Sequence, residues 1–327
     1  MEHKNNWKGW LYLAPVIILM AVFTFYPLLN TILISLVKDY SPMRTYSDGS
    51  HSVWGAIKDN GISLFNYKHV LGIPYMKAGG LIREEKVITY ALPNTIILCF
   101  ITVPLSIAIA LMIAVGLNSI KVLGKFFQTI FFVPYVTNAI AVGMVFAVIF
   151  NGSNGLWNTI FGLGNVAWVG PTYDDLGNLT DPSKFNAMFA LIVYIVWHAL
   201  PYKILILLSG IQNIDKQYYE AAKIDSASKA KTFFRITVPL LSPQIVYILI
   251  TSLIGGFKEY SSVVGLFNAP TATNRGGNYE MYTVVYYIYD NITTHPGYAS
   301  AAAVLLFFII MIFTLIQKLV LDKRTHY

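Results

Sequence analysis

An all-α integral membrane protein with six transmembrane helices is the fold class that the sequence predicts, on three observations. Of the 327 residues, 56% are apolar and only 12% are charged, whereas an average soluble domain has about 25% charged residues. Six stretches stay apolar over the ~20 residues that cross a bilayer core. Backbone groups in hydrocarbon must hydrogen-bond internally, which requires helices there. We expect the spans at 11–36, 90–116, 126–150, 186–211, 241–266 and 298–321.

Prolines lie within the first four of these spans, among them Pro27, Pro93, Pro104, Pro134 and Pro201. We interpret them as kinks rather than breaks, because neighbouring helices can satisfy the carbonyls that a proline leaves free. The first span follows two lysines, as a signal peptide does, but its apolar stretch is about twice the usual length. We therefore expect a retained first helix.

The basic residues of the short loops predict the orientation. The loops 117–125 and 212–240 are rich in lysine and arginine, whereas 151–185 and 267–297 each contain a single basic residue. Basic short loops stay in the cytoplasm, and a long loop can be translocated regardless of its charge. We therefore expect a single transmembrane domain over 1–327 with both termini in the cytoplasm. The basic 37–89 stretch is then an extracellular insert, in which Phe65, Tyr67, Val70 and Leu71 favour a short amphipathic helix.

The sequence lacks the residues that several other classes of function require. The net charge of +7 follows from the topology, so it does not call for nucleic acid as a partner. Cys99 is the single cysteine, which excludes a disulfide within the chain and a cysteine metal site. His198 has no second ligand at helical spacing, so we interpret it as a hydrogen-bonded packing residue and expect no metal.

A polar segment, YYEAAKIDSASKAKTFFRITVPLLSP, separates the fourth and fifth spans at 218–243. Its first part favours helix, and Asp225, Ser226 and Ser228 could cap a second helix that ends near Pro239 and Pro243. Two interpretations remain open from the residues alone. The segment is a docking element for another protein, or it is an amphipathic connector on the lipid headgroups.

Residues 220–243 resemble the cytoplasmic EAA loop of the membrane subunits of binding-protein-dependent ABC importers. The residues that match in register are Glu220, Ala221, Ala222, Asp225, Ala227, Phe233, Ile236, Pro239 and Pro243. Further stretches, such as LAPVIILMAVFTFYPLL, GISLFNYKHVLG and FFVPYVTNAIAVGMVFAVIFNGSNGLWN, are similar to the sugar-permease branch that includes the maltose and glycerol-phosphate permeases. This resemblance covers nearly the whole chain.

The resemblance implies the type I ABC importer permease architecture in a bacterial cytoplasmic membrane. It implies four kinds of partner: a distinct homologue as second permease, two ATPase subunits, an extracellular or lipid-anchored solute-binding protein, and a carbohydrate substrate. The cytoplasmic coupling loop, 212–240, would insert into a cleft on an ATPase. The coupling residues would be Glu220, Ala221, Ala222, Ile224, Asp225, Ser226, Ala227, Phe233 and Pro239.

ATP and Mg²⁺ would be bound by the partner ATPase. The chain has no G-x-x-x-x-G-K-[ST] loop, since its one Gly-Lys pair, Gly124 and Lys125, is followed by Phe126. We therefore expect a transport subunit without a cofactor rather than an enzyme.

Ser226 is the one departure from the loop pattern, because the family usually has glycine there. Glycine allows a positive φ between the two helices, whereas serine reaches that conformation only at a cost. The bend would then be tighter, capped differently, or compensated by the partner.

Polar and aromatic residues at bilayer depth are candidates for a solute path, because they are costly in lipid and suit a sugar. These substrate-path candidates are Tyr135, Asn138, Trp197, Tyr202, Phe257, Lys258, Glu259 and Tyr260. The resemblance adds that Tyr202, Lys258 and Glu259 match positions that face the substrate. Three alternatives remain. Asn138 could instead hydrogen-bond another helix. Lys203 could snorkel to the inner surface. Lys258 and Glu259 could be interfacial, if the fifth span ends early.

An ion-coupled secondary transporter of a polar solute is the main rival. It would need intramembrane carboxylates for ion coupling, of which Glu259 is the only one. It would also leave the EAA loop unexplained.

Overall fold

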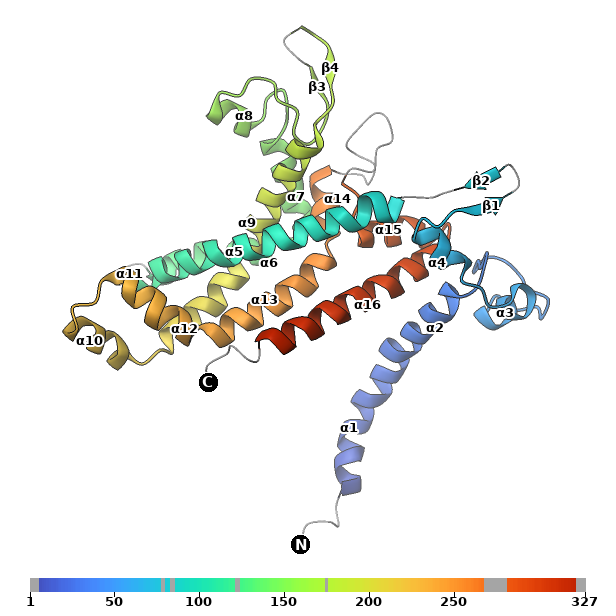
Figure 1. Cartoon of the computed structure of the whole chain (residues 1–327), viewed down its shortest axis with the longest axis horizontal. Helices are drawn as coiled ribbons and strands as arrows, with labels where there is room; N and C mark the ends of the chain where they lie inside the picture. The colour runs from blue at the N-terminus through green and yellow to red at the C-terminus, as the bar shows by residue number, and fades with distance from the viewer. Residues whose placement is uncertain are drawn as a thin grey trace. The chain divides into compact units, whose positions relative to one another are not determined.

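The computed structural model describes residues 6–77, 80–82, 86–120, 124–173, 176–267 and 281–321, and these residues are mostly helical (Figure 1). The chain forms two compact units. The first contains Met1–Ile88 and Tyr287–Phe308, and the second contains Thr89–Tyr286 and Ile309–Tyr327.

Among the described residues, four helices are long and apolar enough to cross a membrane: Gly9–Ser35, Lys86–Ser119, Lys184–Gln212 and Pro296–Leu319. Two bent helix pairs bring the number to six if each pair is one span. The spans are built from α1 (Asn6–Met20), the π-helical turn η1 (Ala21–Phe25), α2 (Tyr26–Ser35), the π-helical turn η2 (Lys86–Ala91), α5 (Leu92–Ser119), α9 (Lys184–Gln212) and α16 (Pro296–Leu321). The helices stay continuous at Pro104 and Pro201, as we predicted for kinks.

The third predicted span, 126–150, is broken rather than kinked. It consists of α6 (Gly124–Val136) and α7 (Ala139–Ile149), and the helix axis turns by 106° between them. Pro134 lies within α6, so it is not the breaking residue. Asn138 ends the run of helical backbone: its side-chain oxygen accepts hydrogen bonds from the N–H groups of Ile140 at 2.9 Å and Ala141 at 3.3 Å. An N-cap of this kind starts a new helix.

The fifth predicted span, 241–266, is also shorter than expected. Its continuous part is α13 (Ser242–Phe257), which is followed by the break 258–260 and by α14 (Ser261–Phe267). Before it, α11 (Lys229–Thr232), the π-helical turn η3 (Phe233–Thr237) and α12 (Val238–Leu240) meet α13 at an angle of 66°. The helix ends after two glycines, where the Lys258 N–H bonds back to the Gly255 carbonyl at 2.9 Å.

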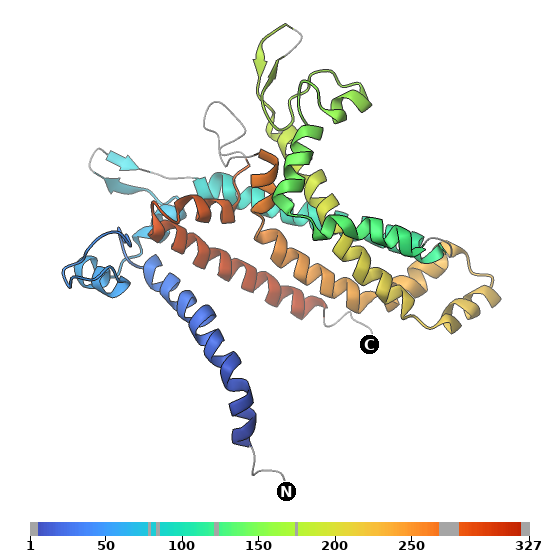
Figure 2. The ribbon, with the colours of Figure 1, turned by 180° about the vertical axis from the view of Figure 1, so that it is seen from behind.

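The second unit is held together by helix pairs. Helix α5 packs along α9 and α13, and α14 packs against α7, as Figure 2 shows for the last pair. The α7–α14 contact depends on two glycines, since a Cβ on Gly143 would lie 2.7 Å from the Cα of Gly265. These two short helices therefore touch backbone to backbone.

The remaining elements lie in the loops. The first unit contains α3 (Val53–Asn60), α4 (Phe65–Val70) and the antiparallel pair β1 (Tyr75–Lys77) and β2 (Gly80–Ile82). Helix α4 is the short helix predicted in the insert. The other elements are α8 (Leu156–Phe161), the antiparallel pair β3 (Thr172–Tyr173) and β4 (Leu179–Thr180), α10 (Lys216–Ile224) and α15 (Val284–Asn291).

Candidate solute path and coupling loop

Three tyrosines from three helices form one polar aromatic surface in the second unit, which we call the tyrosine surface. The rings of Tyr135 in α6 and Tyr202 in α9 stack with centroids 5.9 Å apart and planes 15° apart. The Tyr202 hydroxyl lies 3.3 Å from that of Tyr247 in α13. Tyr135 is 57% exposed and Tyr247 is 52% exposed. Ring faces and hydroxyls are thus both accessible from one side.

Sequence reasoning found Tyr135 and Tyr202 but missed Tyr247. Tyr247 stands alone in the aliphatic run IVYILI of the fifth span. A single hydroxyl in such a run was the available signal, because a tyrosine in a span usually needs a partner for its hydroxyl.

Trp197 belongs to a neighbouring aromatic cluster. Its ring lies 5.2 Å from that of Phe146 in α7, which also contacts Tyr194 at 5.0 Å. The Tyr194 hydroxyl donates to the carbonyl of Ala139 at the start of α7. The ring centroids of His198 and Tyr194 lie 6.0 Å apart. Its buried Nε2 has no hydrogen-bond partner within the described part of the chain, so the predicted hydrogen bond is absent on that nitrogen.

The candidates at the end of the fifth span have different surroundings. Phe257 is 1% exposed and packs against Phe313 at 5.3 Å, so it lies in the core and not on an open surface. Lys258 is exposed at the end of α13. Glu259 accepts a hydrogen bond from the Ser262 N–H at 3.1 Å, which caps α14. Tyr260 packs against Tyr286 at 5.5 Å. The segment 258–260 is therefore a helix break, as in the alternative that the span ends early.

Lys203 does not snorkel. Its side chain is only 3% exposed, and its Nζ donates to the Ser106 hydroxyl of α5. Ser106 in turn bonds the carbonyl of Val103 at 3.0 Å. Among the residues that the structure describes, the one ion pair is Lys58 with Asp48 at 3.9 Å. Lys203 is thus buried between α5 and α9 without a carboxylate.

The coupling loop contains two short helical pieces that side-chain hydrogen bonds cap and join. Asp215 caps α10 by accepting from the Gln217 N–H at 2.9 Å, and Ser228 caps α11 by accepting from the Lys231 N–H at 3.3 Å. The Tyr219 hydroxyl lies 3.2 Å from the Thr237 hydroxyl, which ties the two helical pieces together. Of the three residues that could cap the second helix, Ser228 does so.

Ser226 adopts the left-handed conformation that glycine favours, with φ of 51°. Its N–H bonds the Lys223 carbonyl at 3.0 Å, and the Ala227 N–H bonds the Ala222 carbonyl at 2.9 Å. These two bonds form a Schellman motif, the common helix end that usually has glycine at this position. The chain therefore keeps the glycine geometry, and serine bears its steric cost.

Replacing Ser226 with glycine should raise the free energy of unfolding by about 1 kcal/mol, because glycine enters this conformation without a Cβ clash. The change would appear as a higher melting temperature of the purified protein in detergent. Ser252→Gly is the matched control. Ser252 lies inside α13, where glycine should lower the melting temperature. Equal shifts for both variants would contradict the assigned conformation.

The loop exposes three large apolar side chains. Ile224 is 84% exposed, Phe234 is 69% exposed and Tyr218 is 53% exposed. Of the predicted coupling residues, Glu220 is also exposed, Ala222 is buried, and Phe233 is half-buried against Phe234 with the rings 4.9 Å apart. Phe234 was missed because the sequence pattern points to Phe233. Such a patch beside a polar loop is suited to another protein.

The chain is similar to several known proteins. The model of the family described as binding-protein-dependent transport system inner membrane component matches residues 106–327. The lactose transport system permease protein LacF of Rhizobium radiobacter is 30% identical over 310 residues, which cover 93% of this chain and 90% of that protein. The arabinooligosaccharides transport system permease protein AraP of Halalkalibacterium halodurans is 28% identical, with 93% of this chain and 84% of that protein covered.

A solved structure has the same fold. It is the crystal structure of a bacterial ABC transporter involved in the import of the acidic polysaccharide alginate. The chain superposes on it with a TM-score of 0.72 at 18% identity, over 99% of this chain and 98% of that chain.

Proposed function

Because the chain belongs to the family of binding-protein-dependent transport system inner membrane components, we propose that it forms, with a second permease, the translocation path for a carbohydrate. Membership makes the chain a multi-pass inner membrane subunit of an ABC importer, which works with a solute-binding protein and a separate ATPase that binds ATP. The ion-coupled transporter is excluded by this membership. The proposal concerns the solute, the residues that contact it and the composition of the complex.

The tyrosine surface carries the carbohydrate proposal. A sugar ring has apolar faces and a rim of hydroxyls, so it suits stacked aromatic rings that also offer hydroxyls. The stacked pair Tyr135 and Tyr202 offers ring faces, and the Tyr202–Tyr247 pair offers donors and acceptors. Oligosaccharides or disaccharides appear in the names of the two relatives, lactose and arabinooligosaccharides, and we infer an oligosaccharide here.

The other path candidates take different parts in this proposal. Trp197, which is 39% exposed, belongs to the neighbouring aromatic cluster with Phe146 of α7. Asn138, Glu259 and the exposed Lys258 lie at the helix breaks, where they hold or line the irregular backbone. Tyr260 and the buried Phe257 support this region through their ring contacts.

The coupling loop is proposed to transmit ATPase closure to α9 and α13. It joins both helices directly, and its capped, cross-linked geometry makes it stiff enough to move as one piece. Glu220 would face basic or polar groups of an ATPase, and Ile224 and Phe234 would fill an apolar cleft. Both termini are proposed to be cytoplasmic, with two ATPases and a distinct second permease in the complex.

Co-purification tests this proposal. The chain, extracted in mild detergent, should bring down an ATPase and a second permease. Glu220→Lys should reduce the recovery of the ATPase by about tenfold or more, because it places a like charge against the proposed partner surface.

Lys184→Glu, a charge reversal at the exposed first residue of α9, is the control and should recover the ATPase like the wild type. Recovery that does not change in Glu220→Lys and in a chain lacking 218–239 would overturn the coupling role. Uptake by this chain alone in proteoliposomes would overturn the proposed complex.

A further inference from the structure

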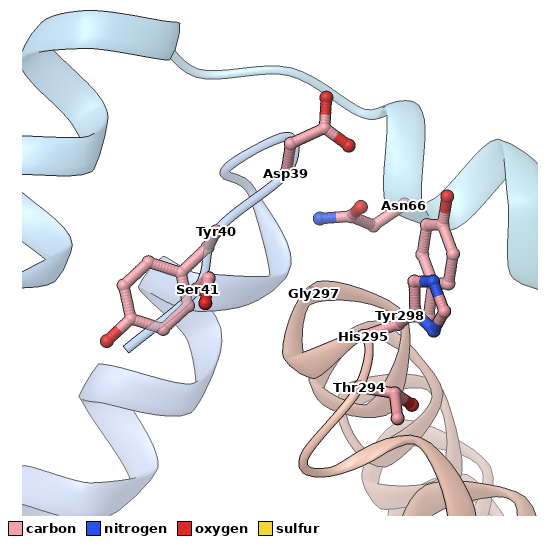
Figure 3. Close-up of a pocket in the computed structure, with 8 residues that line it drawn as sticks. All are labelled: Asp39, Tyr40, Ser41, Asn66, Thr294, His295, Gly297 and Tyr298. Atoms are coloured by element: carbon pink, nitrogen blue, oxygen red, sulfur yellow. The ribbon is translucent and has the colours of Figure 1, made fainter. Parts of the chain in front are cut away.

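A polar cavity lies in the first unit, and none of its lining residues belongs to the tyrosine surface. Its volume is about 190 Å³, and it is lined by residues 39–41, Asn66 and residues of the 294–298 turn (Figure 3). This is the space of roughly six water molecules. The cavity therefore has room for one small polar molecule and not for a long chain.

The backbone beneath this cavity is fixed by hydrogen bonds. The carbonyls of residues 35–38, at the end of α2, each accept one. Asn66 supplies two from its Nδ2 at 3.0 and 2.9 Å, the Ser63 N–H supplies one at 2.7 Å, and the Asn60 amide supplies one at 2.9 Å. The carbonyl at the end of α2 and the three that follow it are thus all satisfied, and the protein itself holds this wall of the cavity.

Two hydrogen-bond acceptors remain available in this cavity. Both N–H groups of the Asn66 amide are used by carbonyls, so its side-chain oxygen is the group left to bind a ligand. Asp39 follows the fixed segment with φ of 52°, one of two positive φ values outside glycine in the described residues. Its carboxylate is exposed, and the structure gives it no hydrogen bond or ion pair within the described ranges.

The opposite wall is aromatic. The Tyr298 ring stacks on His69 with centroids 3.7 Å apart and planes 8° apart, and on His295 at 5.2 Å and 10°. Gly297 lets this turn pass close to Asn66, because a Cβ there would lie 2.7 Å from the Asn66 Nδ2. Three stacked rings therefore hold His295 against the cavity, as Figure 3 shows for His295 and Tyr298.

We propose that this cavity binds a single neutral sugar ring, as a site separate from the tyrosine surface. A carboxylate and an amide oxygen accept hydrogen bonds from adjacent sugar hydroxyls, and the hydroxyls of Ser41 and Thr294 both donate and accept. The lining contains no lysine or arginine, which disfavours a phosphate or a carboxylate ligand. The inference rests on the proposed function, which supplies a carbohydrate on the outer side where the orientation puts residues 37–89.

D-glucose is the probe for this site. Its binding is measured by saturation-transfer NMR on the complete complex in lipid nanodiscs, without the solute-binding protein. Asp39→Asn should raise the apparent dissociation constant for D-glucose by about tenfold, since it removes one charge-assisted hydrogen bond. Thr294→Val should also weaken binding, whereas Thr293→Val, the neighbour that does not line the cavity, should bind like the wild type.

The variant Tyr202→Ala distinguishes this site from the tyrosine surface. In its background, Asp39→Asn should still raise the apparent dissociation constant for D-glucose by about tenfold. Glucose binding that is lost in Tyr202→Ala and unchanged in Asp39→Asn would overturn the proposal, as would an absence of any binding in the wild type. Binding of L-lysine in place of glucose would also overturn it, because the cavity would then receive a cationic side chain. Recovery of the ATPase is measured on the same preparations, so a failure of this proposal is distinct from a failure of the importer.

Discussion

Gly265→Val is expected to lower the free energy of unfolding by about 3 kcal/mol. A Cβ on Gly265 would lie 2.9 Å from the Ile140 carbonyl oxygen and 3.1 Å from the Gly143 Cα. These neighbours are backbone atoms of α7, so they cannot rotate away as a side chain can. The valine would force α14 off α7 and remove the contact that holds both short helices in place. The melting temperature of the purified protein measures the effect.

Gly116→Val is the matched control, because a Cβ on Gly116 in α5 meets nothing within 4 Å. This variant should melt close to the wild-type temperature. If Gly265→Val and Gly116→Val had the same melting temperature, the close backbone contact that we describe between α7 and α14 would be contradicted. Gly143→Val, on the other side of the same contact, should resemble Gly265→Val.

Tyr202→Ala is expected to raise the KM for uptake of the transported sugar by about tenfold or more, because it removes the central member of the tyrosine surface. The ring stacks on Tyr135, and the hydroxyl meets that of Tyr247. Both the apolar and the hydrogen-bonding halves of the proposed sugar contact are lost at once. Tyr202→Phe should have a smaller effect, because it keeps the stacked ring and loses only the hydroxyl.

Uptake into proteoliposomes that contain the complete importer measures this change. Tyr12→Ala is the control. Tyr12 lies in the first span, is 81% exposed and does not belong to the tyrosine surface. If Tyr202→Ala took up the sugar with the wild-type KM, or if Tyr12→Ala raised the KM equally, the tyrosine surface would not be part of the solute path. The amount of ATPase that co-purifies should stay constant, which separates solute binding from assembly.

The sequence predicts the long helices well where one apolar run is one helix. The first, second, fourth and sixth runs are such cases, and their helix bounds in the structure lie within a few residues of those expected. The third run fails because it is apolar on both sides of Asn138, so hydropathy alone joins α6 to α7. The cap that breaks it is local, and Asn138 is a favoured N-cap residue.

The candidate path was harder to predict, because the sequence of a helix that is apolar all round does not indicate which face packs against its neighbours. Phe257 and Tyr202 look alike in sequence, yet Phe257 packs in the core while Tyr202 meets Tyr135 and Tyr247. Helix packing alone decides between them. The resemblance of residues 220–243 to the EAA loop could be seen from their pattern, but the bend at Ser226 stayed open in the sequence. Ser226 has the backbone that glycine favours, because the motif is set by hydrogen bonds between main-chain atoms.

The two helix breaks at 137–138 and 258–260 cannot face lipid hydrocarbon. A break in hydrocarbon would leave backbone groups unpaired, each at a cost of several kcal/mol. Asn138 and Glu259 satisfy only some N–H groups of α7 and α14, and the exposed Lys258 would also keep its ammonium hydrated. A hydrated zone at these breaks would let the proposed sugar exchange water for protein hydroxyls without entering hydrocarbon.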